Sequence, residues 1–196
     1  PMVSLVAEVD SFLVMLGDAC AQLKEEGITI ERPRVGVMAE VPAITTLIPF
    51  LAGRIDFVSI GTNDLSQYIL AIDRSNARVT HLSDPLHPAV IDTVEKIVLA
   101  SLSNGMDLSV CGEMAADPCS VVLLLAMGVE TLSMAAYSIP EIKWVIRNIS
   151  RRAAREQLKQ VRKYHHPEQT RSHLRAFLVD QGLGGILEPG MGEIVT

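Results

Sequence analysis

Short apolar segments alternate with helix-like segments along most of the chain, and this alternation restricts the fold more than any other feature. The apolar segments are PMVSLV, PRVGVMAE, IDFVSIG, DLSVCGE and ETLSMAA. Between them, apolar residues recur three and four positions apart, which is the spacing of one face of a helix. Strands that alternate with helices form a parallel sheet covered by those helices. We therefore predict an α/β fold with about five strand–helix units.

The pattern is compatible with two closures of the sheet, an open doubly wound sheet and a (β/α)8 barrel. A full barrel takes about 250 residues, whereas about five units use roughly the first 150 residues here, so a barrel would be incomplete. After residue 150 the composition becomes charged and helix-like, and the chain ends in the glycine-rich LGGILEPGMGEIVT. We therefore divide the chain into a partial barrel domain, residues 1–150, and a C-terminal helical tail, residues 151–196.

Composition excludes several classes of function. The formal net charge is −6, so no basic field exists to bind nucleic acid or an anionic membrane. The apolar run SVVLLLAMG is too short to span a bilayer, which takes ~20 apolar residues. The three cysteines have neither a metal-binding spacing nor that of a disulfide framework, which predicts a reducing compartment, the cytoplasm.

Polar side chains follow the strand-like segments, at the ends where parallel sheets bind ligands. Glu40 ends VGVMAE, Asn63 and Asp64 follow VSIGT, Cys111 ends LSVC, and Arg74 follows a short helix. Two carboxylates from neighbouring strands suit Mg²⁺ when phosphate oxygens of a ligand complete its shell. An arginine clamps a phosphate with two parallel bonds. The set suits a small phosphorylated carboxylic acid, although each residue alone has a structural alternative, such as a helix cap or a surface ion pair.

Four segments carry a resemblance to a known family: GVMAEVPA, DFVSIGTNDLSQYILAIDRSN, HLSDPLHPAV and DLSVCGEMAADP. They resemble the phosphoenolpyruvate–protein phosphotransferases, enzyme I of the bacterial phosphotransferase system. AIDRSN and CGEMAADP fit this family better than the related dikinases and phosphoenolpyruvate synthases. EVPA and AFLVDQGLGGIL are more similar to the nitrogen-related branch than to the sugar-transport branch.

The resemblance implies a C-terminal phosphoenolpyruvate-binding domain, a (β/α)8 barrel that dimerises and needs Mg²⁺. By position, Glu40 and Asp64 match its metal ligands, and Asn63 and Asp64 match residues that contact the substrate. Arg74 matches the arginine that binds phosphate. Cys111 matches the catalytic acid that protonates the methylene carbon of enolpyruvate. An ordinary thiol has a reference pKa of about 8.5, so it is mostly protonated at neutral pH and suits this role.

Parts of the family pattern have no counterpart in this sequence. The phosphorylated histidine of the family belongs to an N-terminal domain, and none of the five histidines here stands in its context. The first barrel strands of the family, with further arginines, are expected to precede Pro1. We expect a parent protein that converts phosphoenolpyruvate to pyruvate and passes the phosphoryl group to its own histidine. A histidine phosphocarrier protein would then receive it.

Two alternatives remain open. The chain is either the barrel of a pyruvate phosphate dikinase or phosphoenolpyruvate synthase, or a catalytically inactive fragment that serves dimerisation or binding. In either case we expect a homodimer, because an incomplete barrel exposes a sheet edge and an apolar face. Without the further arginines of the family, the isolated chain is expected to bind phosphoenolpyruvate weakly or not at all.

Overall fold

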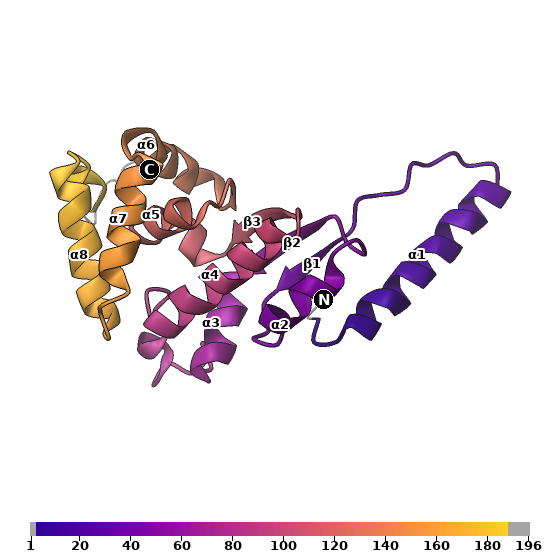
Figure 1. Ribbon diagram of the computed structural model, residues 1–196, viewed down its shortest axis with the longest axis horizontal. Coiled ribbons are helices and arrows are strands. Elements are labelled where there is room, and N and C mark those ends of the chain that lie inside the picture. The colour runs from indigo at the N-terminus through magenta and orange to yellow at the C-terminus, as the bar shows by residue number, and fades with distance from the viewer. Residues whose placement is uncertain (1–2, 188–196) are drawn as a thin grey trace.

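Four parallel strands form the centre of the computed structural model, which describes residues 3–187 (Figure 1). The strands are β1 Gly36–Ala39, β2 Phe57–Gly61, β3 Asp107–Cys111 and β4 Thr131–Ser133. Their order in the sheet is β1-β2-β3-β4, and every neighbouring pair is parallel. A doubly wound sheet reverses its strand order near the middle, whereas consecutive strands of a barrel wall keep it. The observed order therefore matches the barrel alternative, but the sheet is open within the described residues and barrel closure stays a prediction.

Helices follow the strands and continue into the C-terminal part of the chain. The α-helices are α1 Val6–Glu25, α2 Ile44–Leu51, α3 Thr62–Leu70, α4 Pro88–Ser103, α5 Pro118–Met127, α6 Ile139–Asn148, α7 Arg151–Val161 and α8 Pro167–Asp180. Short 3₁₀ helices lie at η1 Thr80–Leu82, η2 Glu113–Ala115, η3 Ala136–Ser138 and η4 Gly184–Leu187.

The capping residues of α5 account for both of its ends. Asp117 precedes the helix and its side chain accepts a hydrogen bond from the Ser120 amide at 3.0 Å. Pro118 occupies the first helical position, where no amide hydrogen is needed. Gly128 ends the helix with a φ of 99°, a left-handed conformation that glycine adopts without strain.

The two faces of the sheet differ in burial, and this difference positions the functional residues. One face carries Val58, Ile60 and Val110, which are all 0% exposed and belong to a hydrophobic core shared with helices α2 to α5. The opposite face carries Ser59 and Cys111, which are only partly buried. A closed barrel would turn this second face inward, as alternation of side chains along each strand requires.

The strand predicted at residues 1–6 is wrong for its described part. Val3–Leu5 are irregular and α1 begins at Val6, while residues 1–2 lie outside the described residues. A carboxylate oxygen of Glu8 accepts hydrogen bonds from the amides of Ser4 and Leu5, both at 2.8 Å. These amides are therefore bonded at the start of α1 and do not pair with a neighbouring strand. The described structure has four strand–helix units in place of about five.

The two tail helices share the core of the sheet domain. Helix α7 buries Leu158 and Val161, and helix α8 buries Leu174 and Leu178, with at most 5% of any of these side chains exposed. Both helices contact α5 (Figure 1). The tail, which its sequence shows to be charged, is therefore amphipathic, and one face of its helices packs on the sheet domain. Most of its glycine-rich end, residues 188–196, lies outside the described residues.

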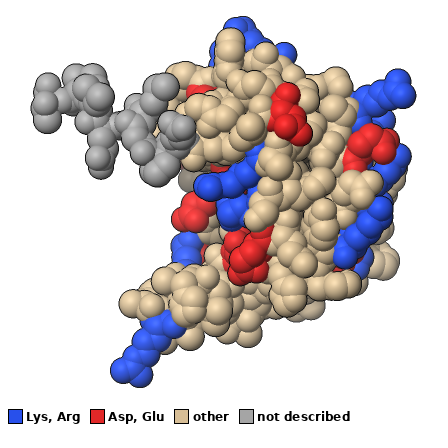
Figure 2. All heavy atoms as spheres, turned by 90° about the vertical axis from the view of Figure 1, so that its left-hand side faces the viewer, with Lys and Arg blue, Asp and Glu red and all other residues tan. Residues whose placement is uncertain are grey.

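The described surface combines large apolar side chains with charges of both signs. Figure 2 shows acidic and basic groups next to one another on the face formed by the tail helices. Exposed apolar residues lie on α1 and near α6, where Tyr137 is 86% and Trp144 is 56% exposed. None of the helices in residues 3–187 is both long and apolar enough to cross a membrane.

We predict that the chain self-associates at micromolar concentration, because exposed aromatic side chains and an open sheet favour a covering partner. Light scattering coupled to size exclusion should give a mass above that of the monomer, increasing with concentration. Replacing Tyr137 and Trp144 together by serine should lower this mass. Leu99→Ser is the matched control, since Leu99 is also 56% exposed but lies on α4. A monomer at every concentration would contradict the prediction.

Candidate functional site

Strands β1, β2 and β3 end close to one level at one edge of the sheet, and the candidate residues lie at or just after their ends. The register pairs Ala39 with Ile60 and Gly61 with Cys111. Glu40 therefore follows β1 at the level where β2 and β3 end. Helix α3 begins one residue after β2, so Asn63 and Asp64 lie in its first turn at the same edge. All five residues selected from the sequence belong to the segments at this edge or, for Arg74, to the loop that follows α3.

Cys111 lies on the partly buried face of the sheet, among polar and sulfur atoms. Its sulfur is 3.4 Å from the carbonyl oxygen of Ile60 and 3.8 Å from the sulfur of Met38. The hydroxyl of Ser59 is also 3.8 Å away. The thiol hydrogen can be donated to this carbonyl, which orients the sulfur at the end of β3.

Cys119 has a different environment, although it is only eight positions further along the chain. It is 1% exposed, and burial raises the pKa of its thiol to about 12, with a smaller contribution from the charge of Asp117. A thiol with this pKa stays protonated at neutral pH and is not a nucleophile. Cys119 is therefore a packing residue of the core.

Gly61 brings the side chains of Glu40 and Met38 to the same point. A Cβ atom on Gly61 would lie 3.0 Å from a carboxylate oxygen of Glu40 and 3.1 Å from the sulfur of Met38. The Met38 sulfur also contacts the thiol of Cys111. Met38 thus contacts Cys111 across β2, in a space that a side chain at position 61 would fill.

Gly112 allows the loop after β3 to contact the start of α3. Its φ is +96°, and a Cβ atom would lie 2.6 Å from the Thr62 hydroxyl and 2.7 Å from the Asn63 side-chain oxygen. The Thr62 hydroxyl donates to the carbonyl of Cys111 at 2.8 Å, and the Glu113 amide donates to the Asn63 side chain at 2.9 Å. These two bonds fix Asn63 and Cys111 relative to each other.

Two carboxylates and one arginine set the charge at this edge. Burial raises the pKa of Glu40, and the negative charge of Asp64 raises it further. The Arg74 guanidinium lies 3.3 Å from the Asp64 carboxylate. A divalent cation between the two acids would relieve their repulsion, so the pair fits Mg²⁺. Because no group of three or more His, Cys, Asp or Glu in residues 3–187 is arranged to hold a metal, other oxygen ligands would have to complete its shell.

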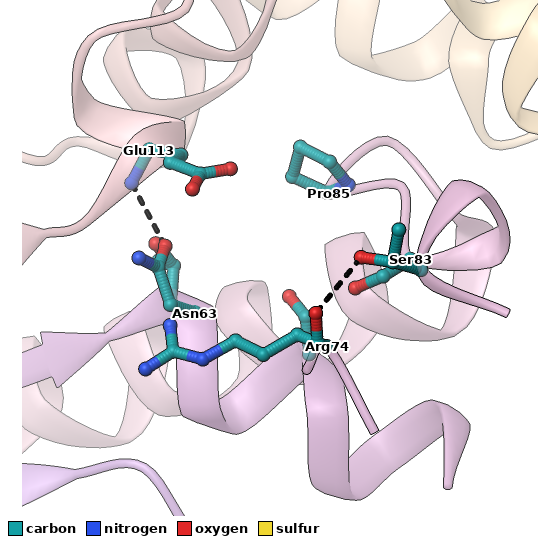
Figure 3. A pocket seen from close by; sticks show the side chains of 8 residues that line it. Asn63, Arg74, Ser83, Pro85 and Glu113 are labelled. Atoms are coloured by element: carbon teal, nitrogen blue, oxygen red, sulfur yellow. Dashed lines mark hydrogen bonds between the residues drawn. The ribbon is translucent and has the colours of Figure 1, made fainter. Parts of the chain in front are cut away.

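A cavity of about 250 Å³ lies beside these residues, between α3, the loop of residues 71–87 and η2 (Figure 3). Its walls are mostly polar and are formed by Thr62, Asn63, Ser66, Arg74, Thr80, Ser83, Pro85 and Glu113. Asn63 and Arg74 were selected from the sequence, and both line it. Glu40, Asp64 and Cys111 are not part of its lining, but Asp64 joins it through the ion pair with Arg74.

Several lining residues were not selected from the sequence. Ser66 is 4% exposed, and its hydroxyl has no hydrogen-bond partner among the described residues. It lies one helical turn after Thr62, so helical spacing was the signal that could have identified it. Thr80 donates to the carbonyl of Arg74 at 3.2 Å, the bond drawn beside Arg74 in Figure 3. The hydroxyls of Ser66 and Ser83 give the cavity donors for an anion, whereas the hydrogen of Thr80 is donated to the Arg74 carbonyl.

The comparisons with known proteins agree on one family of enzymes. The family model of the PEP-binding domain of PEP-utilising enzymes matches residues 1–151. A protein of Salmonella typhimurium named "Phosphoenolpyruvate-dependent phosphotransferase system" is 38% identical over 192 residues, which are 97% of this chain and 26% of that protein. Proteins named "Phosphoenolpyruvate-protein phosphotransferase" from Haemophilus influenzae and Cupriavidus necator are 42% identical over 151 residues and 39% identical over 176 residues. The Haemophilus match covers 76% of this chain and 26% of that protein, and the Cupriavidus match 89% and 30%. The chain thus spans less than a third of the length of these relatives.

We predict that Gly112→Ala lowers the free energy of unfolding by about 2–4 kcal/mol, because a left-handed conformation and a steric clash both oppose the new methyl group. Gly53→Ala is the matched control, since its φ is +76° but no atom lies within 4 Å of the added Cβ. The control should cost only about 1 kcal/mol. Urea unfolding of both variants measures the difference, and equal losses would contradict the close approach at Gly112.

We predict that Glu40→Gln makes the chain more stable at neutral pH. The folded state raises the pKa of Glu40, so the carboxyl group favours folding most below its unfolded pKa. That advantage is lost as the pH rises through the folded pKa, and glutamine does not titrate. Thermal unfolding between pH 4 and pH 7 should therefore show an increasing gain for the variant.

Glu156→Gln should behave in the opposite way at neutral pH. A hydrogen bond from Lys159 lowers the pKa of Glu156, so its charged form favours folding above the unfolded pKa. The effect is small because this ion pair is exposed. A Glu40→Gln variant that loses stability as the pH rises would contradict the assignment of repulsion between Glu40 and Asp64.

Proposed function

The chain belongs to the PEP-utilising enzymes, as their PEP-binding domain, and from this membership we propose that it is the substrate-binding part of a phosphoenolpyruvate–protein phosphotransferase. The observation that supports the proposal is the level ending of β1, β2 and β3, with Glu40, Asp64 and Cys111 following or ending these strands. Relatives that carry this name match most of the chain, and the Salmonella relative also matches its tail. We further propose the nitrogen-related branch, on the EVPA and AFLVDQGLGGIL segments.

The cavity next to Arg74 is the proposed binding site for the phosphoryl group of phosphoenolpyruvate. Arg74 would exchange its ion pair with Asp64 for two parallel bonds to phosphate oxygens. Ser66 and Ser83 offer hydroxyl groups in the same cavity, and Asn63 contributes its side-chain amide. These groups bind and orient an anion without a large positive field, in keeping with the net charge of −6.

Glu40 and Asp64 are the proposed ligands of Mg²⁺. When bound, the ion would neutralise the negative charge that develops on the enolate oxygen. Release of Asp64 from Arg74 frees a carboxylate oxygen for this purpose. Burial raises the pKa of Glu40, and the charge of Asp64 adds to this effect, so a cation between the two acids would offset both.

Cys111 is the proposed acid of the reaction. Transfer of the phosphoryl group to a histidine outside this chain leaves the enolate of pyruvate. The sulfur of Cys111 would give its proton to the methylene carbon of that enolate, so that the C–H bond of the pyruvate methyl group forms and a thiolate remains. Water or a buffer acid then restores the thiol. A histidine phosphocarrier protein would receive the phosphoryl group in a later step.

A second candidate function is assembly, because Tyr137 and Trp144 are exposed near α6. In this case the chain holds two copies of the parent protein together and contributes no turnover of its own. The two functions are compatible within one parent protein, and homodimerisation is proposed for it. A dikinase or a phosphoenolpyruvate synthase would also need a nucleotide-binding domain outside this chain.

Turnover can be tested in a fusion in which this chain replaces the segment of the Salmonella relative that it matches. We predict that this fusion releases pyruvate from phosphoenolpyruvate when Mg²⁺ is present. Cys111→Ala should reduce the release by about 100-fold or more, the usual contribution of a general acid. Calorimetry should show that binding of phosphoenolpyruvate with Mg²⁺ is retained, because Cys111 is proposed to act only on the enolate.

Cys20→Ala is the control for thiol loss, since Cys20 lies on α1 and is only partly buried. It should leave pyruvate release unchanged. Full turnover by Cys111→Ala would refute the proposed acid, whereas an inactive unsubstituted fusion would refute the proposed function itself.

A further inference from the structure

One arginine of the tail joins the two segments that border the cavity. Arg171 lies on α8, and its guanidinium is 2.8 Å from the carboxylate of Asp84. The other terminal nitrogen of the same guanidinium lies 3.7 Å from the carboxylate of Asp117. Asp84 and Asp117 belong to different connections of the sheet domain, the loop before α4 and the turn before α5. A single side chain therefore bridges two separate parts of the site.

Each of the two acids sits next to residues that form the cavity wall. Asp84 stands between Ser83 and Pro85, which both line the cavity. Asp117 stands four positions after Glu113, the lining residue from η2. Figure 3 shows Pro85 and Glu113 on opposite sides of the cavity. The distance between these two walls thus depends on the positions of the two acids that Arg171 joins.

Each acid is also hydrogen-bonded within its own segment, so a shift of the acid would shift the cavity wall beside it. Asp84 accepts a hydrogen bond from the Leu86 amide at 2.8 Å. Asp117 caps α5 and accepts from the amide and the hydroxyl of Ser120, at 3.0 and 2.5 Å. Neither carboxylate can move far without breaking these local bonds.

The bridge is more protected from water than the ion pair of Arg34 and Asp107, which also joins distant parts of the chain. The side chains of Arg171, Asp84 and Asp117 are 33%, 22% and 25% exposed. By comparison, those of Arg34 and Asp107 are 64% and 72% exposed. Partial burial reduces screening, so a partly buried pair contributes more than an exposed one.

The helix that carries Arg171 is itself firmly placed. Leu174 and Leu178, on the same helix, are 0% and 1% exposed and pack into the core. Burial and the charge of Asp117 raise the pKa of Glu141, which places a further acid close to the bridge. Arg171 therefore meets the two acids from a helix that the core holds in place.

We propose that Arg171 is a positioning residue. From its place on the tail helix α8, it sets the separation between the loop of Arg74 and the turn after Cys111. This assignment rests on the proposed function only in taking the cavity as the place where the substrate phosphate binds. A lysine cannot replace the arginine fully, because its one nitrogen cannot occupy both positions from which the two terminal nitrogens of the guanidinium reach Asp84 and Asp117.

Hydrogen–deuterium exchange of the 196-residue chain tests the bridge without any ligand. In Arg171→Gln, amides of residues 80–87 and 112–117 should exchange about threefold to tenfold faster, while strands β1 to β3 keep their protection. In Arg171→Lys the first segment should keep its protection and the second should lose it, because the Asp84 contact is the shorter one.

Arg162→Gln is the matched control. Arg162 pairs with Glu95 and so joins α7 to α4, away from the cavity. It should leave exchange in both cavity segments unchanged. Unchanged exchange in Arg171→Gln would overturn the proposal, and so would faster exchange confined to α8 or spread evenly over the chain, because Arg171 would then only hold the tail in place. If Arg171→Gln does not fold, the two segments in Arg171→Lys decide the matter.

The fusion with the Salmonella relative adds a kinetic readout. Arg171→Gln should raise the KM for phosphoenolpyruvate about threefold to tenfold, because the two walls must then be ordered by the substrate itself. A loss of folded enzyme alone would lower kcat and leave KM unchanged, and this result would count against a positioning role. If the unsubstituted fusion is inactive, the proposed function fails, but the exchange experiment still decides whether Arg171 joins the two segments.

Discussion

The register of three parallel strands is the constraint on which the rest of the site depends. Pairing of Ala39 with Ile60 and of Gly61 with Cys111 makes β1, β2 and β3 end at one level. Because parallel strands point the same way, the residues that follow them gather at a single edge. A shift of β1 by one residue would turn Met38 to the buried face and remove its contact with the thiol of Cys111. The chemistry proposed for this chain therefore begins with backbone hydrogen bonds between strands.

Close approach of the chain segments then turns this edge into a site. Gly61 and Gly112 lack side chains at two points of this edge where neighbouring segments come close to one another. The bonds of Thr62 and Asn63 to the loop after β3 use the space that is left. Further out, Arg171 links the walls of the cavity to a helix of the tail. The tail that packs on the sheet domain is thus connected to the site through the partly buried ion pairs of Arg171.

Much of this arrangement was predictable from local sequence patterns. The strands at β1 to β4 and the cap of α5 follow from short apolar segments, Asp117-Pro118 and Gly128. Residues 1–6 also looked like a strand, but local pattern does not say whether a neighbouring strand is present, and Glu8 binds the amides of Ser4 and Leu5 to start a helix. Helical spacing could have identified Ser66. The contact of Arg171 with Asp84 spans 87 positions, so no local pattern could have predicted it.

The central claim is that Glu40 and Asp64 bind one divalent cation beside Cys111. Its most direct test is the broadening of backbone NMR signals of the chain by Mn²⁺, a paramagnetic substitute for Mg²⁺. The account predicts that signals of residues 40, 61–64 and 111–113 broaden first, that α7 and α8 are spared, and that Glu40→Gln removes the effect. No selective broadening, or broadening centred on a different part of the molecule, would contradict it.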